Sequence, residues 1–291
     1  MVGIPRSGWA GEEGPITNLQ VRCRTAASPV TRGTPPWDSE RYLRFEAERT
    51  LPCRDLVGRI ELDAPARLVD LGCGPGTSTG VLAHRWPASS IVGVDHSSEM
   101  LDRARALPLS VEWVRADLGE WAPNAPFDLV FSNATLHWLP DHRTVIPRLW
   151  RWVAPGGALA FQVPVRGGPT VGWVRAIERT LAREPWRSLT WIDVAGANVV
   201  PLETYYDLLS GDARRLDLWD TEYVHVLAGA PEIVEWIRGT ALRPLVAQLP
   251  GEEERRRFLG ELTEEIGRAY EARPDRNVLF PFLRRFVVAY R

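Results

Sequence analysis

The hydrophobic pattern in the middle of the chain alternates between short apolar runs and amphipathic stretches. The apolar runs predict strands at 66–71, 90–95, 111–116, 127–132 and 158–163. The amphipathic stretches between most of them predict helices at 77–86, 98–106 and 141–153, with Gly156-Gly157 as a turn from helix to strand. Continuous apolar strands separated by helices are typical of a parallel sheet that is covered on both faces.

The pattern changes on both sides of this region. Residues 1–36 are rich in Gly, Pro, Ser and Thr without a hydrophobic run of signal-peptide type, and they predict a disordered extension. Residues 38–58 predict a helix that is interrupted near Pro52. After residue 165 the pattern predicts helices at 169–184, 202–210, 231–242 and 252–271, and strands at 215–227 and 278–290.

These segments together predict an α/β fold with a Rossmann-like sheet that is mostly parallel and has an antiparallel last strand. We expect one domain over residues 37–291, with an N-terminal helical segment. Helical cap insertions are expected at about 165–212 and 229–275.

Charge and cysteine content narrow the class of protein. All 35 basic residues are arginine, and the chain has 37 acidic residues, which gives a net charge of −2. A charge balance of this kind argues against a nucleic-acid or membrane-surface partner. No apolar run reaches the length of a membrane span. Cys23, Cys53 and Cys73 are odd in number and far apart, so we expect no disulfide framework and a cytoplasmic location.

A glycine-rich loop follows the first predicted strand. Asp70 is succeeded by Gly72, Gly74 and Gly76, and alternating glycines allow a sharp turn and a close approach of a ligand to the backbone. The spacing differs from the G-x-G-x-x-G of dinucleotide-binding loops. Asp70 would repel a pyrophosphate but suits an ammonium group, which favours S-adenosylmethionine over a dinucleotide.

The next predicted strands also end in polar residues. Asp95 is placed to accept hydrogen bonds from ribose hydroxyls, and Asp117 from an adenine amino group, with Leu118 covering the ring. Asn133 ends the fourth strand, where cofactor and substrate should meet. Each acid alone could instead be a turn or helix-cap residue. The ordered set favours a cofactor site.

The motifs resemble those of class I S-adenosylmethionine-dependent methyltransferases. The strings that carry this resemblance are D-L-G-C-G-P-G, G-V-D-H-S-S-E-M-L, A-D-L, F-D-L-V-F-S-N-A-T-L-H-W-L-P-D and L-W-R-W-V-A-P-G-G-A-L-A-F-Q-V-P. Segments at 37–50, 201–209, 223–227, 233–244 and 279–289 extend the resemblance to the trans-aconitate 2-methyltransferase group. The resemblance covers about residues 37–291. It implies that S-adenosylmethionine is the cofactor, bound by the residues of the four strand ends, and that no metal is needed.

The same resemblance implies a substrate wall. Its members would be Trp37, Tyr42, His137, Trp138, Tyr205, Tyr206, His225, Trp236 and Arg243. Arg44, Arg166 and Arg175 are further candidates for binding a polyanion. Two features depart from the family pattern: His137 replaces a usual Gln, and residues 165–171 replace an Asn-containing stretch that ends in a Ser-His pair.

The implied reaction is methylation of a carboxylate of trans-aconitate or a related small organic acid. A carboxylate is already ionised at neutral pH, so no general base is required. His137 could act as a hydrogen-bond donor that orients the acceptor, as a base for a hydroxyl or amine acceptor, or as a packing residue. A small-molecule O- or N-methyltransferase and a non-catalytic cofactor-binding protein are the alternatives.

Overall fold

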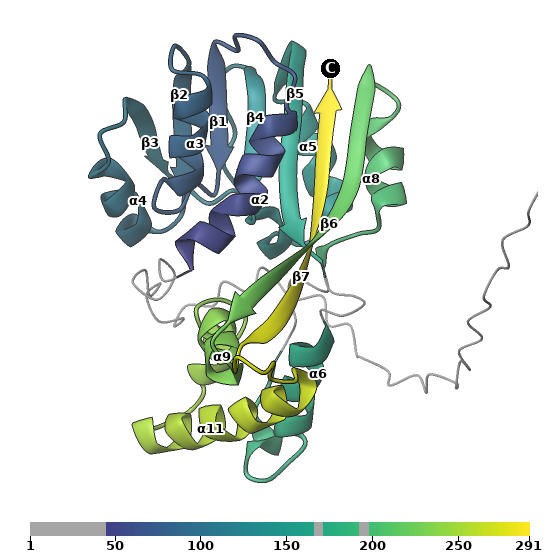
Figure 1. Cartoon of the computed structure of the whole chain (residues 1–291). Coiled ribbons are helices and arrows are strands. Elements are labelled where there is room, and N and C mark those ends of the chain that lie inside the picture. Colours follow the sequence, from purple (N-terminus) through teal and green to yellow (C-terminus); the bar gives the residue numbers. More distant parts are fainter. Residues whose placement is uncertain (1–44, 166–170, 192–197) are drawn as a thin grey trace, which may run out of the picture. The chain divides into compact units, whose positions relative to one another are not determined.

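A seven-stranded sheet forms the centre of the protein, and its strand order is β3-β2-β1-β4-β5-β7-β6 (Figure 1). The computed structural model describes residues 45–165, 171–191 and 198–291. The predicted extension at 1–36 lies outside these residues. The strands are β1 (Arg67–Leu71), β2 (Ser90–Asp95), β3 (Val111–Arg115), β4 (Phe127–Asn133), β5 (Val153–Pro164), β6 (Arg215–Leu227) and β7 (Val278–Tyr290).

Strand direction divides the sheet into two parts. The pairs among β1 to β5 are parallel, whereas β7 is antiparallel to both β5 and β6. In Figure 1 the yellow β7 lies between β5 and β6. The predicted Rossmann-like sheet with an antiparallel end is therefore confirmed.

Helices cover both faces of the sheet because its central strands are apolar on both sides. On one face, Leu68, Leu129 and Phe286 pack with α2 (Glu46–Arg59) and α3 (Thr77–Arg85). On the other, Val69 and Phe161 pack with α5 (His142–Trp150) and α8 (Leu202–Leu209). Helix α4 (Ser98–Arg105) joins β2 to β3, and its first turn is capped by the Ser97 hydroxyl. Among the described residues, no helix is long and apolar enough to cross a bilayer.

Helix α2 is continuous, so the predicted interruption near Pro52 is wrong. Pro52 lies inside the helix on its buried side. The neighbouring side chains Cys53, Leu56 and Val57 are buried at helical spacing against the sheet. We infer that this packing outweighs the loss of one backbone hydrogen bond at the proline.

The boundary between α5 and β5 also differs from the prediction. Helix α5 ends at Trp150, and β5 already begins at Val153 and includes Gly156-Gly157, which were predicted as a turn. Val153 pairs with Phe127 at the start of β4, and the register then shifts before Leu129 pairs with Ala158. The glycine pair is therefore part of an irregularity within the strand, where Gly156 has a φ of 81°.

A helical layer packs against the ends of β6 and β7 that extend past the parallel strands. It contains α6 (Gly172–Leu181), α9 (Ala230–Arg238), α10 (Arg243–Val246) and α11 (Glu252–Ala269). Trp173, Ile233 and Phe258 of these helices share one buried cluster with Phe280 of β7. Helix α8 falls within the predicted insertion 165–212, yet it packs against α5 and the sheet. The domain bounds at 37–291 and the two insertions stay predictions.

One buried carboxylate connects α11 to α6. Glu265 is 2% exposed and accepts hydrogen bonds from Arg179, Arg183 and Arg268. The hydrogen bond from Arg179 and the nearby Arg183 hold the pKa of Glu265 below its ordinary value, against the opposing effect of burial.

Because this pKa is lower in the folded state, the carboxylate stabilises the fold above about pH 4.3, the ordinary value for Glu. The stabilisation is lost as the pH falls below that value through the lowered pKa.

We expect Glu265→Gln to reduce the free energy of unfolding at pH 7 by about 1 to 3 kcal/mol. Chemical denaturation from pH 7 to 3 should show this difference shrinking in acid. Glu253→Gln, which changes an exposed ion pair on the same helix, is the control and should have little effect. A difference that stayed constant with pH would contradict the prediction.

Candidate active site

The glycine-rich loop connects β1 to α3 at the carboxyl edge of the sheet. Gly72, Gly74 and Gly76 have φ values of 73°, 54° and 90°, in the left-handed region that favours glycine. A Cβ on Gly72 would lie 2.1 Å from Cγ2 of Thr135. At Gly74, by contrast, a Cβ would have no atom within 4 Å. The loop is thus packed on one side and exposes bare backbone on the other, as a cofactor cradle requires.

Asp70 lies fully buried beneath this loop. Its Oδ2 accepts hydrogen bonds from the hydroxyls of Ser78 and Thr79 on α3, each at 2.7 Å. Its Oδ1 is buried and has no hydrogen-bond partner among the described residues. Burial raises the pKa of Asp70 to about 6, although both hydroxyls act in the opposite direction. One oxygen therefore binds the first turn of α3 through two hydrogen bonds, and the other oxygen can still accept a hydrogen bond.

Asp95 holds the same loop from the end of β2. Its Oδ2 accepts a hydrogen bond from the backbone N–H of Gly74 at 2.9 Å, and its Oδ1 accepts one from Ser97 at 2.8 Å. A carboxylate offers about four lone-pair sites, so Asp95 retains the capacity to accept further hydrogen bonds. Asp95 is 8% exposed, which places it at the border between protein interior and surface.

The ends of β4 and β5 are joined by a side-chain hydrogen bond. Nε2 of Gln162 donates to Oδ1 of Asn133 at 2.6 Å. Gln162 is fully buried, and its Oε1 has no hydrogen-bond partner in the described part of the chain. Thr135, after β4, donates from Oγ1 toward Gly72 O at 3.1 Å and Asn133 O at 3.3 Å, connecting this edge to the glycine-rich loop. Gln162 and Thr135 were not singled out from the sequence, although a polar residue within an apolar strand was a usable signal.

The third acid has a local structural role. Asp117 is exposed after β3, and its Oδ1 accepts a hydrogen bond from the N–H of Gly119 at 2.7 Å. This is the turn geometry that remained an alternative for this residue. Leu118 is buried and packs in the cluster that includes Val94 at the end of β2.

His137 and Trp138 lie directly after β4, in the short 3-10 helix η1 (Leu136–Trp138). Their ring centroids are 4.7 Å apart, and His137 is 6% exposed. The backbone carbonyl of His137 accepts a hydrogen bond from Asn198. This pair is therefore next to Asn133, at the edge where the sequence placed the reacting centre.

Tyr205 and Tyr206 of α8 have different environments. Tyr205 is fully buried in the cluster on the opposite sheet face from Asp70, and its hydroxyl is 2.5 Å from Nδ1 of His142. Nε2 of His142 is 2.9 Å from the carbonyl of Leu136, so its N–H donates there and Nδ1 accepts from Tyr205. Tyr206 is 53% exposed. The structure thus does not bring these two side chains together with the residues at the ends of β1 and β4.

His225 and Trp236 contact each other beside the extended part of the sheet, with ring centroids 4.6 Å apart. Both are buried; Trp236 belongs to the cluster of the helical layer, and the His225 ring contacts that cluster at Trp236 and Phe280. Arg243 begins α10 and is half-buried, whereas Arg175 is exposed on α6. The remaining candidates, Trp37, Tyr42, Arg44 and Arg166, lie outside the described residues, as do residues 166–170 of the altered segment.

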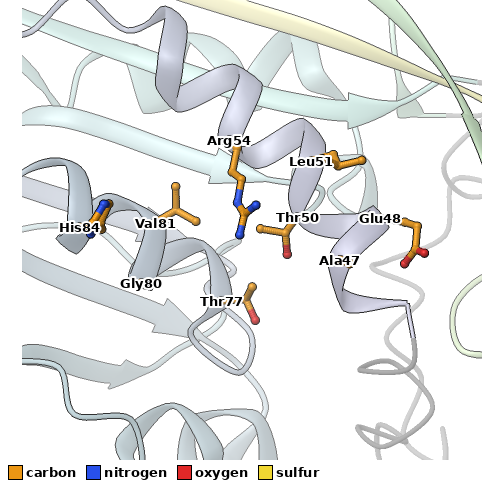
Figure 2. Close-up of a pocket in the computed structure, with 9 residues that line it drawn as sticks. All are labelled: Ala47, Glu48, Thr50, Leu51, Arg54, Thr77, Gly80, Val81 and His84. Atoms are coloured by element: carbon orange, nitrogen blue, oxygen red, sulfur yellow. The ribbon is translucent and has the colours of Figure 1, made fainter.

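A groove of about 880 Å³ runs between α2 and α3 (Figure 2). It extends from Thr77, the first residue of α3, to His84 in the last turn of that helix. Figure 2 shows the Arg54 side chain reaching from α2 toward α3. Only the Thr77 end adjoins the glycine-rich loop, so the groove leads away from the strand ends. Among the described residues, no group of three or more His, Cys, Asp or Glu side chains could hold a metal ion.

Comparison with known proteins connects this geometry to a family. A family model described as "Methyltransferase domain" matches residues 68–157, which include the glycine-rich loop and Asn133. The trans-aconitate 2-methyltransferase of Azoarcus sp. (strain BH72) is 47% identical over 264 residues, covering 88% of this chain and 100% of that relative. The enzyme of the same name from Variovorax paradoxus (strain S110) is 43% identical, covering 88% and 98%.

Solved structures share the fold at low sequence identity. The YcgJ protein from Bacillus subtilis has a TM-score of 0.54 at 14% identity, covering 84% of this chain and 98% of that chain. Phosphoethanolamine N-methyltransferase 2 of Haemonchus contortus, solved with S-adenosyl-L-methionine, has a TM-score of 0.51 at 17% identity and covers 82% and 52%. The fold, the glycine-rich loop and the relatives that match over nearly their whole length all indicate the same family. The chain belongs to the trans-aconitate 2-methyltransferase family and is an S-adenosylmethionine-dependent methyltransferase.

Proposed function

We propose that this protein transfers the methyl group of S-adenosylmethionine to one carboxylate of trans-aconitate, forming a methyl ester. The observation that carries the proposal is the 47% identity to a trans-aconitate 2-methyltransferase along its whole length. The relatives match the antiparallel end and helical layer as well as the cofactor motifs, since they cover 88% of the chain. Those regions are where acceptor specificity is expected to reside.

The residues at the strand ends fit the cofactor. Bare backbone at Gly74 would lie against the nucleoside, and the free lone pairs of Asp95 would accept the ribose hydroxyls. The unpartnered Oδ1 of Asp70 fits the ammonium group of the methionine part. Leu118 and Asp117 would contact the adenine. The cofactor, when bound, supplies an electrophilic methyl group on a sulfonium centre.

The protein's part in the reaction is positioning. The acceptor carboxylate is ionised at neutral pH and attacks in line, so no proton has to be removed. Asn133, held by Gln162, would orient the reacting groups at the end of β4. Gln162 and His137 are buried, and polar contacts that the acceptor made beside them would be stronger than the same contacts in water.

His137 would orient the acceptor as a hydrogen-bond donor rather than remove a proton. We therefore expect His137→Gln, which retains a donor and restores the usual family residue, to change kcat for trans-aconitate only a few-fold. Removal of a general base would lower kcat by a factor on the order of 10² to 10⁴. Steady-state kinetics on the purified variant measure the difference. A loss in that larger range would assign proton removal to His137 and favour a hydroxyl or amine acceptor.

The decisive experiment uses S-adenosylmethionine with a labelled methyl group. The purified protein is incubated with trans-aconitate, cis-aconitate and other small acids, with a reaction lacking acceptor as control. We expect label in an acidic product from trans-aconitate and its release by mild alkali, as a methyl ester requires. Label that survives alkali would point to an ether or methylamine. No transfer to any of the acids would overturn the proposal while leaving the family assignment intact.

A further inference from the structure

The segment between β4 and α5, which contains η1, has strained backbone at both of its ends. Ala134, the residue after Asn133, has a φ of 53°, and Asp141, the residue before α5, has a φ of 52°. This left-handed region favours glycine and is unfavourable for alanine. Strained backbone persists only where the surrounding structure fixes it, so the contacts of this segment determine where η1 lies.

Two hydrogen bonds fix the first residues of the segment. The N–H of Ala134 donates to the carbonyl of Gln162 on β5 at 3.0 Å. The hydroxyl of Thr135 donates to the carbonyl of Gly72 in the glycine-rich loop at 3.1 Å. The chain that enters η1 is therefore bound to both β5 and the cofactor loop.

Two consecutive backbone carbonyls of η1 are bound from outside the sheet. The carbonyl of Leu136 is 2.9 Å from Nε2 of His142, the first residue of α5. The carbonyl of His137 accepts a hydrogen bond from Nδ2 of Asn198 at 3.0 Å. Asn198 lies shortly before α8 in the chain. Helix α5 and the chain that leads into α8 thus both bind η1 through its backbone.

Tyr205 of α8 completes this connection. Its hydroxyl is 2.5 Å from Nδ1 of His142, and both side chains are fully buried. Its ring packs edge-to-face on Phe161 of β5, with the ring centroids 5.3 Å apart, which fixes the place of the hydroxyl. Burial lowers the pKa of His142 below its ordinary value, so the imidazole is neutral at pH 7. A neutral ring has a single N–H, and because the Leu136 carbonyl can only accept, the Tyr205 hydroxyl must donate to Nδ1.

We propose that Tyr205 and His142 are positioning residues for methyl transfer. The Tyr205 hydroxyl selects the tautomer of His142, and that tautomer holds η1 at the carbonyl of Leu136. In this position η1 presents His137 beside Asn133, at the edge where the acceptor would react. Tyr205 therefore acts on the acceptor through His142 and η1. This inference rests on the proposed function, because it assigns what holds the residues that would orient the acceptor.

Two substitutions separate the two ring nitrogens of His142. The amide of His142→Gln extends to the place of Nε2 and can still donate to Leu136, whereas the shorter amide of His142→Asn reaches only the place of Nδ1 and its partner Tyr205. Each variant loses one buried hydrogen bond, so their losses of stability should be similar. We expect kcat for trans-aconitate to fall roughly 10- to 100-fold in His142→Asn and only a few-fold in His142→Gln. Equal losses of kcat in the two variants would overturn the inference.

Tyr205→Phe removes the hydroxyl and keeps the ring on Phe161. We expect kcat to fall roughly 3- to 10-fold, with KM and the Kd for S-adenosylmethionine nearly unchanged. The matched control is Tyr290→Phe, because Tyr290 is 2% exposed and its hydroxyl also makes hydrogen bonds, with Glu61 and Arg59. This control should lose stability as Tyr205→Phe does, while kcat stays at the wild-type value.

Hydrogen exchange measures the hold on η1 without any acceptor. The N–H groups of Trp138 and Leu139 donate within η1, to the carbonyls of Thr135 and Leu136. We expect Tyr205→Phe to raise the exchange rate of peptides that cover 134–139 by roughly 10-fold and to leave β7 unchanged. Tyr290→Phe should not affect 134–139.

The two measurements distinguish this inference from the proposed function. If trans-aconitate is not methylated but exchange rises locally at 134–139, the hold on η1 stands and the proposed function fails. If trans-aconitate is methylated and Tyr205→Phe has the kcat of the wild type, the inference fails alone. No methylation together with unchanged exchange would overturn both.

Discussion

Replacing Gly72 by alanine is expected to destabilise the protein by about 2 to 5 kcal/mol and to abolish measurable cofactor binding. The residue has a φ of 73°, which costs a side chain about 1 to 2 kcal/mol. The new Cβ would also lie 2.1 Å to 2.5 Å from three side-chain atoms of Thr135, and overpacking of this kind costs about 1 to 3 kcal/mol more. Urea denaturation and calorimetry with S-adenosylmethionine measure the two effects.

The steric origin of this effect can be tested separately. Gly211→Ala is the control, because a Cβ there has no atom within 4 Å and the residue is outside the left-handed region. In a double-mutant cycle, Thr135→Ala should recover part of the stability that Gly72→Ala loses, since it removes the two closest atoms. Purely additive losses would show that the clash is not the cause.

Asp95→Asn is expected to raise the Kd for S-adenosylmethionine by roughly 100-fold, although it changes the shape of the side chain very little. The two carboxylate oxygens of Asp95 each accept one backbone N–H, from Gly74 and from Ser97. An amide has only one oxygen, so one of these N–H groups must face an NH₂ group instead. The variant also loses a charged acceptor for the ribose hydroxyls.

The control for this prediction is Asp102→Asn on α4. Asp102 is exposed and pairs with Arg105, so its neutralisation should leave the Kd for the cofactor unchanged. Calorimetry at one salt concentration compares both variants with the wild type. A Kd within a few-fold of the wild-type value for Asp95→Asn would exclude Asp95 from cofactor binding.

Local patterns were sufficient for the central sheet and the cofactor loop. The strand bounds at 90–95, 215–227 and 278–290 agree with the structure, because each is a continuous pattern with turn residues on both sides. Asp70 and Asp95 could be placed at one edge, since parallel strands all end there. The continuity of α2 through Pro52 could not be predicted from the sequence, because it depends on packing of the helix against the sheet.

The acceptor side of the site was harder to predict. Tyr205 was expected in the substrate wall; it lies in the cluster on the sheet face opposite Asp70, with its hydroxyl on His142, and its role toward the substrate stays a prediction. The position of Tyr205 depends on the packing of α8 against α5. The hydrophobic periodicity of α8 alone does not indicate whether the helix packs against α5 or against the helical layer. His225 and Trp236 were both expected in the substrate wall; their rings are in contact, and their role toward the substrate stays a prediction.

The sequence by itself determined the element order, the glycine-rich loop and the polar strand ends, since hydrophobic periodicity and turn chemistry act over a few residues. Only the tertiary structure decided which polar groups meet. Gln162 reaches Asn133 through the ladder between β4 and β5, and Arg284 stands opposite Pro164 through the ladder between β5 and β7, although these strands are far apart in the chain. The register of those ladders is set by burial of whole faces, to which the entire sheet contributes.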